Sequence, residues 1–200
     1  MSHDTTHSVL SEEARHEDGK TMFGFWTYLM TDFVLFASLF AVFIVLRGNI
    51  LHGFAGNELF NMQVVLAETL ILLTSSLTCG IFLLSARAGH VNGALAWMFA
   101  TALLGVAFIC IELTEFVGLI QEGNGPSSSG FFSAFFTLVG THGLHVVAGL
   151  AWMIALMIRV AQCGLTRANM RKLMLLGMFW HFLDIIWIFI FTIVYLMGTI

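Results

Sequence analysis

Charged residues are scarce in this chain: they make up 10% of its 200 residues, and proline occurs once. The three cysteines, Cys79, Cys110 and Cys163, show no CxxC spacing. They are therefore expected to be small packing residues, without a disulfide or a cysteine-ligated cluster. The mean hydropathy is +0.92, so a separate soluble domain is not expected. No nucleic-acid partner is expected either.

Five long apolar stretches take the place of the missing charges. Each exceeds the ~20 residues that cross about 30 Å of hydrocarbon. They are residues 23–46, 62–86, 93–120, 131–158 and 173–198. Because a spanning backbone must satisfy its own hydrogen bonds, residues 23–200 are predicted to form an all-α integral membrane protein, a bundle of five transmembrane helices.

The first 22 residues differ from the rest. They are polar and carry five acids against two bases, which predicts a disordered tail. No basic start is followed by a short apolar region, so the first span itself is expected to direct membrane insertion.

Basic residues predict the orientation of the bundle. One side of the membrane would hold seven of the eight Lys and Arg residues, and the other side only Arg47. The positive-inside rule then puts the N-terminus in the cytoplasm and the C-terminus on the periplasmic side. Four basic residues lie in or before a predicted loop at 165–172 and either contact anionic lipid head groups or act only as a topology signal. These are Arg159, Arg167, Arg171 and Lys172.

Eight ionisable residues lie inside the predicted spans. A charge at bilayer depth costs roughly 2.5–3.5 kcal/mol on insertion scales, so each such group needs a partner or a function. They are Asp32, Glu68, Glu112, Glu115, His142, His145, His181 and Asp184. Six of them form pairs three residues apart, and such pairs share one face of a helix. With a rise of about 1.5 Å per residue, the positions of these residues along their spans predict two polar layers at different depths in the membrane.

The two layers are a hypothesis from depth. The inner layer joins Asp32, His145, His181 and Asp184, and the outer layer joins Glu68, Glu112, Glu115 and His142. Three interpretations stay open. The groups satisfy one another inside the bundle, they exchange protons, or they hold a metal or haem. Di-metal bundle proteins use Glu-x-x-His pairs, whereas this chain has Glu-x-x-Glu, His-x-x-His and His-x-x-Asp.

Three segments resemble a known family. The segments FGFWTYLMTDFVLF, SGFFSAFFTLVGTHGLHVVAGL and FWHFLDIIWIFIFTIVYLMG are similar to subunit III of the haem–copper terminal oxidases. The resemblance covers about residues 23–198. The five-span form and both C-terminal segments look most like the cytochrome o ubiquinol oxidase branch.

The resemblance implies a non-catalytic chain with no metal site and no cofactor of its own. Haem and copper would belong to the partner subunit I, and this chain would stabilise the complex, hold phospholipid beside subunit I and support proton uptake. Asp32 falls where longer relatives have a buried glutamate that reacts with carbodiimides. The expected function is an accessory subunit of a proton-pumping ubiquinol oxidase. The alternatives are a subunit III of a cytochrome c oxidase and an independent ion-coupled transporter.

Overall fold

The computed structural model describes residues 2–47 and 62–196, with side chains from residue 19 to 46 and from residue 62 onward. It consists of helices, and five of them are long and apolar enough to cross a membrane. Their bounds are α1 Ser2–Arg47, α2 Met62–Arg87, α3 Val91–Gln121, α4 Gly130–Cys163 and α5 Arg167–Ile190, followed by a π-helical turn, η1, at Phe191–Leu196. The predicted all-helical bundle of five spans is confirmed.

The chain divides into two units, of which the first ends at Leu35 and the second begins at Phe36. In the first unit, helix α1 includes polar residues that precede the predicted span. The disorder predicted for residues 1–22 stays a prediction. Within this unit Tyr28 and Asp32, one helical turn apart, share a side-chain hydrogen bond.

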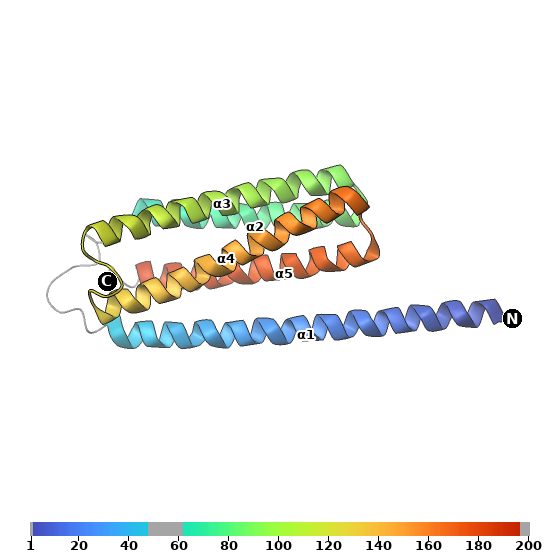
Figure 1. Ribbon diagram of the computed structural model, residues 1–200, viewed down its shortest axis with the longest axis horizontal. Coiled ribbons are helices and arrows are strands. Elements are labelled where there is room, and N and C mark those ends of the chain that lie inside the picture. The colour runs from blue at the N-terminus through green and yellow to red at the C-terminus, as the bar shows by residue number, and fades with distance from the viewer. Residues whose placement is uncertain (1, 48–61, 197–200) are drawn as a thin grey trace. The chain divides into compact units, whose positions relative to one another are not determined.

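The second unit contains a ring of four helices. Contacts join α2 to α3, α3 to α4, α4 to α5, and α5 back to α2, and Figure 1 shows these helices side by side. The last turns of α1 add phenylalanines to this unit. Phe36 lies against His145 on α4, with ring centroids 5.3 Å apart, and Phe43 lies 5.4 Å from Phe131.

Short connections between helices explain why α4 and α5 are adjacent. Gly164 ends α4 with φ +69°, a conformation that glycine adopts without steric cost. Thr166 then accepts a hydrogen bond from the backbone N–H of Asn169 and caps α5. The Asn169 amide in turn donates to the Gly164 carbonyl, 2.8 Å away. The chain therefore reverses within three residues.

The predicted loop at residues 165–172 is wrong for most of its length, because Thr166 caps a helix there. Because α5 begins at Arg167, the residues Arg167, Arg171 and Lys172 lie in its first turns, and Arg159 lies in α4. The helices extend past the apolar spans because capped polar turns continue a helix into the interface. Arg159 and Arg167 are exposed, and Arg171 and Lys172 are half-buried.

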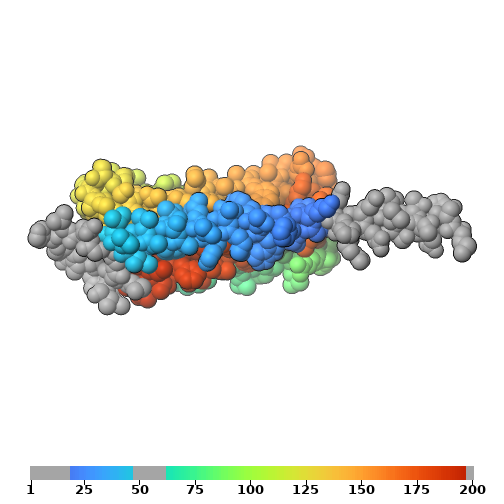
Figure 2. Space-filling view, turned by 90° about the horizontal axis from the view of Figure 1, so that it is seen from below, coloured from blue at the N-terminus to red at the C-terminus, as the bar shows by residue number. Residues whose placement is uncertain are grey.

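The helices bury one side and leave large apolar residues on the other. Leu144, Ile154 and Ile158 of α4 are all exposed. In the space-filling view α4, coloured yellow to orange, is visible along the upper edge (Figure 2). In a membrane protein this surface contacts lipid or another subunit. Of the three cysteines expected to be packing residues, Cys79 is buried, whereas Cys110 and Cys163 are exposed.

Candidate functional site

Three carboxyl groups gather between α2 and α3. Glu112 and Glu115 share one face of α3 because they are three residues apart. Both lie close enough to Glu68 of α2 to interact with it electrostatically. Glu68 is 0% exposed and Glu112 is 5% exposed. The structure thus brings together the three acids that depth alone assigned to the outer layer.

The carboxyl groups of Glu68 and Glu112 are buried, and no hydrogen bond from the described residues replaces their hydration. All four of their oxygens are buried and have no hydrogen-bond partner among the described residues. An ionised carboxylate in such a position costs far more free energy than a neutral acid. These two groups are therefore most stable with a bound proton or with ordered water as a partner.

His142 of α4 is the other member of the predicted outer layer. It is 0% exposed, and neither ring nitrogen has a hydrogen-bond partner in the described part of the chain. Its ring lies 5.9 Å from the ring of Phe108 and 5.2 Å from that of Trp187, between centroids. This aromatic enclosure favours a neutral imidazole that contributes packing.

Two aromatic residues of the site were absent from the sequence-based set. Trp187 of α5 donates a hydrogen bond from Nε1 to Thr69 Oγ1, 3.1 Å away on α2. Tyr195, which is 2% exposed, lies within electrostatic reach of Glu68, Glu112 and Glu115. A signal was present, because Tyr195 is one of only two tyrosines and buried tyrosine hydroxyls need polar neighbours.

A second polar cluster lies between α2 and α5. Ser76 Oγ is 2.7 Å from His181 Nδ1, and the Ser76 hydroxyl also hydrogen-bonds with Asp184. One turn of helix brings His181 and Asp184 to the same serine. Beside it, Trp180 Nε1 donates to Ser75 Oγ over 3.1 Å. The adjacent hydroxyls of Ser75 and Ser76 thus connect α2 to α5.

This cluster contains two of the four residues predicted for the inner layer. His145 Nδ1 hydrogen-bonds with the Thr141 carbonyl of its own helix, 2.7 Å away. Asp32 belongs to the first unit and hydrogen-bonds with Tyr28. Sequence reasoning missed Ser76 as the joint partner of His181 and Asp184.

Replacing Ser76 with alanine tests this cluster. We expect Ser76→Ala to lower the free energy of unfolding by about 1 kcal/mol, as is typical of interhelical side-chain hydrogen bonds in membranes. Thr74→Ala is the matched control, because the Thr74 hydroxyl donates to the Leu70 carbonyl one turn back on the same helix. The measurement is unfolding by SDS of the full chain in mixed micelles. Equal losses in the two variants would contradict a cluster that joins the helices.

Metal-ligating side chains are not grouped in the part of the chain that the structure describes. No set of three or more His, Cys, Asp or Glu residues is placed to hold a metal ion there. His142, the histidine predicted for the same layer as Glu68, Glu112 and Glu115, is enclosed by the rings of Phe108 and Trp187. The donor set among the described residues therefore does not fit a haem or a di-metal centre.

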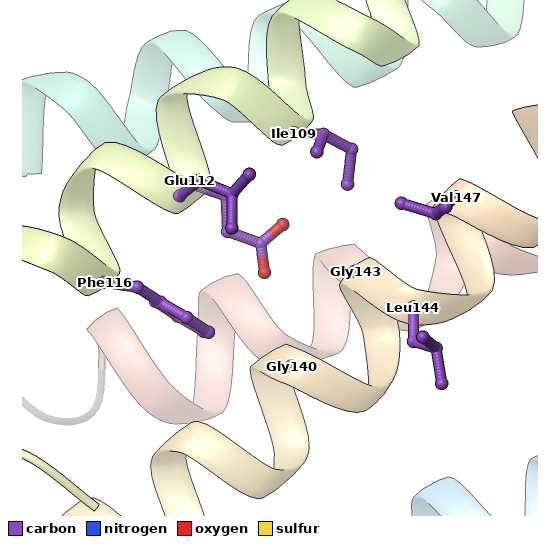
Figure 3. A pocket seen from close by; sticks show the side chains of 8 residues that line it. Ile109, Glu112, Phe116, Gly140, Gly143, Leu144 and Val147 are labelled. Atoms are coloured by element: carbon purple, nitrogen blue, oxygen red, sulfur yellow. The ribbon is translucent and has the colours of Figure 1, made fainter.

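A pocket of about 220 Å³ lies between α3 and α4, with Glu112 in its wall. The other lining residues are apolar or glycine: Ile109, Leu113, Phe116, Gly140, Gly143, Leu144 and Val147. Figure 3 shows the Glu112 carboxyl group pointing from α3 into the space beside Gly143. The pocket thus connects the buried acid cluster with the apolar exterior of the bundle.

Comparison with known proteins identifies the family. Residues 13–199 match the family described as cytochrome c oxidase subunit III. The chain is 54% identical to the cytochrome bo(3) ubiquinol oxidase subunit 3 of Pseudomonas aeruginosa, over 94% of this chain and 90% of the relative. It is 43% identical to the quinol oxidase subunit 3 of Bacillus subtilis, over 93% and 92%. It is 41% identical to the cytochrome bo(3) ubiquinol oxidase subunit 3 of Buchnera aphidicola subsp. Baizongia pistaciae, over 90% of this chain and 93% of the relative. With five spanning helices and matches along almost its whole length, the chain belongs to the cytochrome c oxidase subunit III family.

Proposed function

We propose that this chain is the accessory, non-catalytic subunit III of a proton-pumping ubiquinol oxidase in the bacterial cytoplasmic membrane. The observation that carries the proposal is the match to relatives named ubiquinol or quinol oxidase subunit 3. All three cover at least 90% of this chain. These names favour the quinol branch over a cytochrome c oxidase.

The role proposed within the complex is structural. Haem and copper would reside in the partner subunit I, where quinol is oxidised and oxygen is reduced to water. This chain would stabilise that subunit and hold phospholipid beside it. Its support is the exposed apolar surface of α1 to α4, with residues such as Val45, Leu84 and Leu103 more than half exposed, which needs lipid or protein contact.

The proposed orientation has the N-terminus in the cytoplasm and the C-terminus in the periplasm. Arg159 lies near the end of α4, while Arg167, Arg171 and Lys172 lie at the start of α5. All four residues are thus at the turn between these helices. Basic residues at one end of a pair of spans are retained on the cytoplasmic side, where anionic lipid head groups attract them.

Purification of the tagged chain in mild detergent tests the proposed function. We expect haem and copper to co-purify, visible in the optical spectrum and by metal analysis, and to be lost when a harsher detergent separates the subunits. The co-purifying complex should oxidise ubiquinol. Haem-free chain purified from membranes that contain it in quantity would contradict the proposal and favour an independent transporter. A copper-binding subunit II in the complex, in addition to the copper of subunit I, would place it in the cytochrome c branch.

A further inference from the structure

The pocket between α3 and α4 has the form of a ligand site. It opens toward the apolar exterior of the bundle between Leu113 and Leu144, whose side chains are 56% and 69% exposed. Its walls are apolar except at one point, the carboxyl group of Glu112. A membrane-dissolved molecule in the pocket would therefore lie beside a single polar side chain, that of Glu112.

Glu112 has hydrogen-bonding capacity that the chain leaves unused. The residue is 95% buried, since 5% of it is exposed, and neither carboxyl oxygen has a hydrogen-bond partner among the described residues. In Figure 3 the carboxyl group points away from α3 toward α4. Buried polar groups without a partner are rare in folded proteins, so a ligand hydroxyl or an ordered water would satisfy this carboxyl group.

One of the two glycines that line the pocket on α4 makes room for this group. A Cβ atom on Gly143 would lie 3.1 Å from Oε1 and 3.2 Å from Oε2 of Glu112. A Cβ on Gly140 would instead meet Phe116 Cε2 at 3.7 Å, an ordinary contact. Gly143 therefore sets the position of the carboxyl group, whereas Gly140 borders the pocket without touching Glu112.

The pocket's volume and lining indicate the class of ligand. A dry engineered cavity of about 150 Å³ holds a benzene ring, and this pocket measures about 220 Å³. We propose that the α3–α4 pocket binds an apolar membrane molecule through one hydroxyl group, which pairs with the Glu112 carboxyl. Two sources carry this chemistry: a quinol ring and the free hydroxyl of a lipid. The proposal does not depend on the function proposed above.

Chemical labelling of Glu112 tests the proposal. Diisopropylcarbodiimide dissolves in membranes and reacts with protonated carboxyl groups. The acid proton moves to a carbodiimide nitrogen and the carboxylate oxygen bonds to the central carbon. The resulting O-acylisourea rearranges to an N-acylurea that retains every atom of both reactants. The full chain in lipid nanodiscs should carry this adduct at Glu112, located by mass spectrometry of its peptides. Absence of the adduct in nanodiscs of phosphatidylcholine, a lipid without a free hydroxyl group, would overturn the proposal.

Protection by ligands distinguishes the two sources. Decylubiquinol or 1-dodecanol is added before the carbodiimide, at ten times its dissociation constant, where binding should slow labelling of Glu112 about ten-fold. Protection by decylubiquinol alone assigns the site to a quinol ring, and protection by dodecanol assigns it to a lipid alcohol. If neither compound slows the labelling of Glu112, the proposal is wrong.

Matched variants locate the effect. Gly143→Ala displaces the Glu112 carboxyl, so protection should be lost, whereas Gly140→Ala should retain it. Glu112→Gln should remove the adduct at residue 112. Glu68, which does not line the pocket, should not be protected in any variant. If Gly143→Ala does not fold, the protection of Glu112 in the wild-type chain and in Gly140→Ala still decides the outcome. Equal protection of Glu68 and Glu112 would contradict a site in the pocket.

Discussion

Replacing Trp187 with alanine is expected to lower the free energy of unfolding by about 3–5 kcal/mol, the range for large aromatic residues in a packed core. Trp187 is 1% exposed and makes contacts with three other helices. Its ring lies edge-on to Phe108 of α3, 4.7 Å between centroids, and 5.2 Å from His142 of α4. Its N–H donates to Thr69 of α2. Removal would leave a cavity at the centre of the bundle, and the Thr69 hydroxyl would keep only its hydrogen bond to the Val65 carbonyl.

Two further variants separate these contributions. Trp187→Phe retains most of the ring contact and loses the hydrogen bond to Thr69, so about 1 kcal/mol plus a partial cavity cost is expected. Trp97→Ala is the matched control, because Trp97 of α3 is 39% exposed. All three are measured as SDS unfolding of the full chain in mixed micelles. A loss for Trp97→Ala as large as that for Trp187→Ala would refute the central position of Trp187.

The spans were predictable because a single physical quantity determines them. The apolar runs predicted at 62–86 and 93–120 agree closely with α2 and α3, which end at Arg87 and Gln121, since bilayer thickness fixes the length of a span. The start of α5 was placed too late, at residue 173. Its first two turns are polar and depend on the Thr166 cap, which hydropathy does not report.

The partners of the buried polar residues were only partly predictable. Depth along a helix correctly indicated that Glu68 would lie near Glu112, because α2 and α3 are neighbours along the chain. The depth of a residue in the membrane could not indicate that α5 packs against α2. This packing places Ser76 beside His181, 105 positions later in the sequence. That contact depends on the order of helices around the ring, and hydropathy contains no information on that order.

The second large effect is expected for replacing Gly105 of α3 with alanine. A Cβ on Gly105 would lie 2.9 Å from Trp180 Cη2 and 3.0 Å from Leu150 Cδ2. Trp180 cannot move aside easily, because it is 2% exposed and its N–H is bonded to Ser75. Gly105→Ala is therefore expected to cost about 1–3 kcal/mol of folding free energy, the range for overpacked cores.

Gly118→Ala on the same helix is the control, because a Cβ there meets nothing within 4 Å. In a helix interior alanine is more favourable than glycine by roughly 0.5–1 kcal/mol, so this variant should be neutral or stabilising. The two substitutions are chemically identical, so their difference in SDS unfolding measures how closely Trp180 of α5 and Leu150 of α4 pack against Gly105. If Gly105→Ala were as stable as Gly118→Ala, these two side chains would have room to shift, and the packing around Gly105 would be looser than these distances indicate. A destabilised Gly105→Ala chain should also be recovered in lower yield from membranes, because marginal folding stability limits the steady-state amount of a protein.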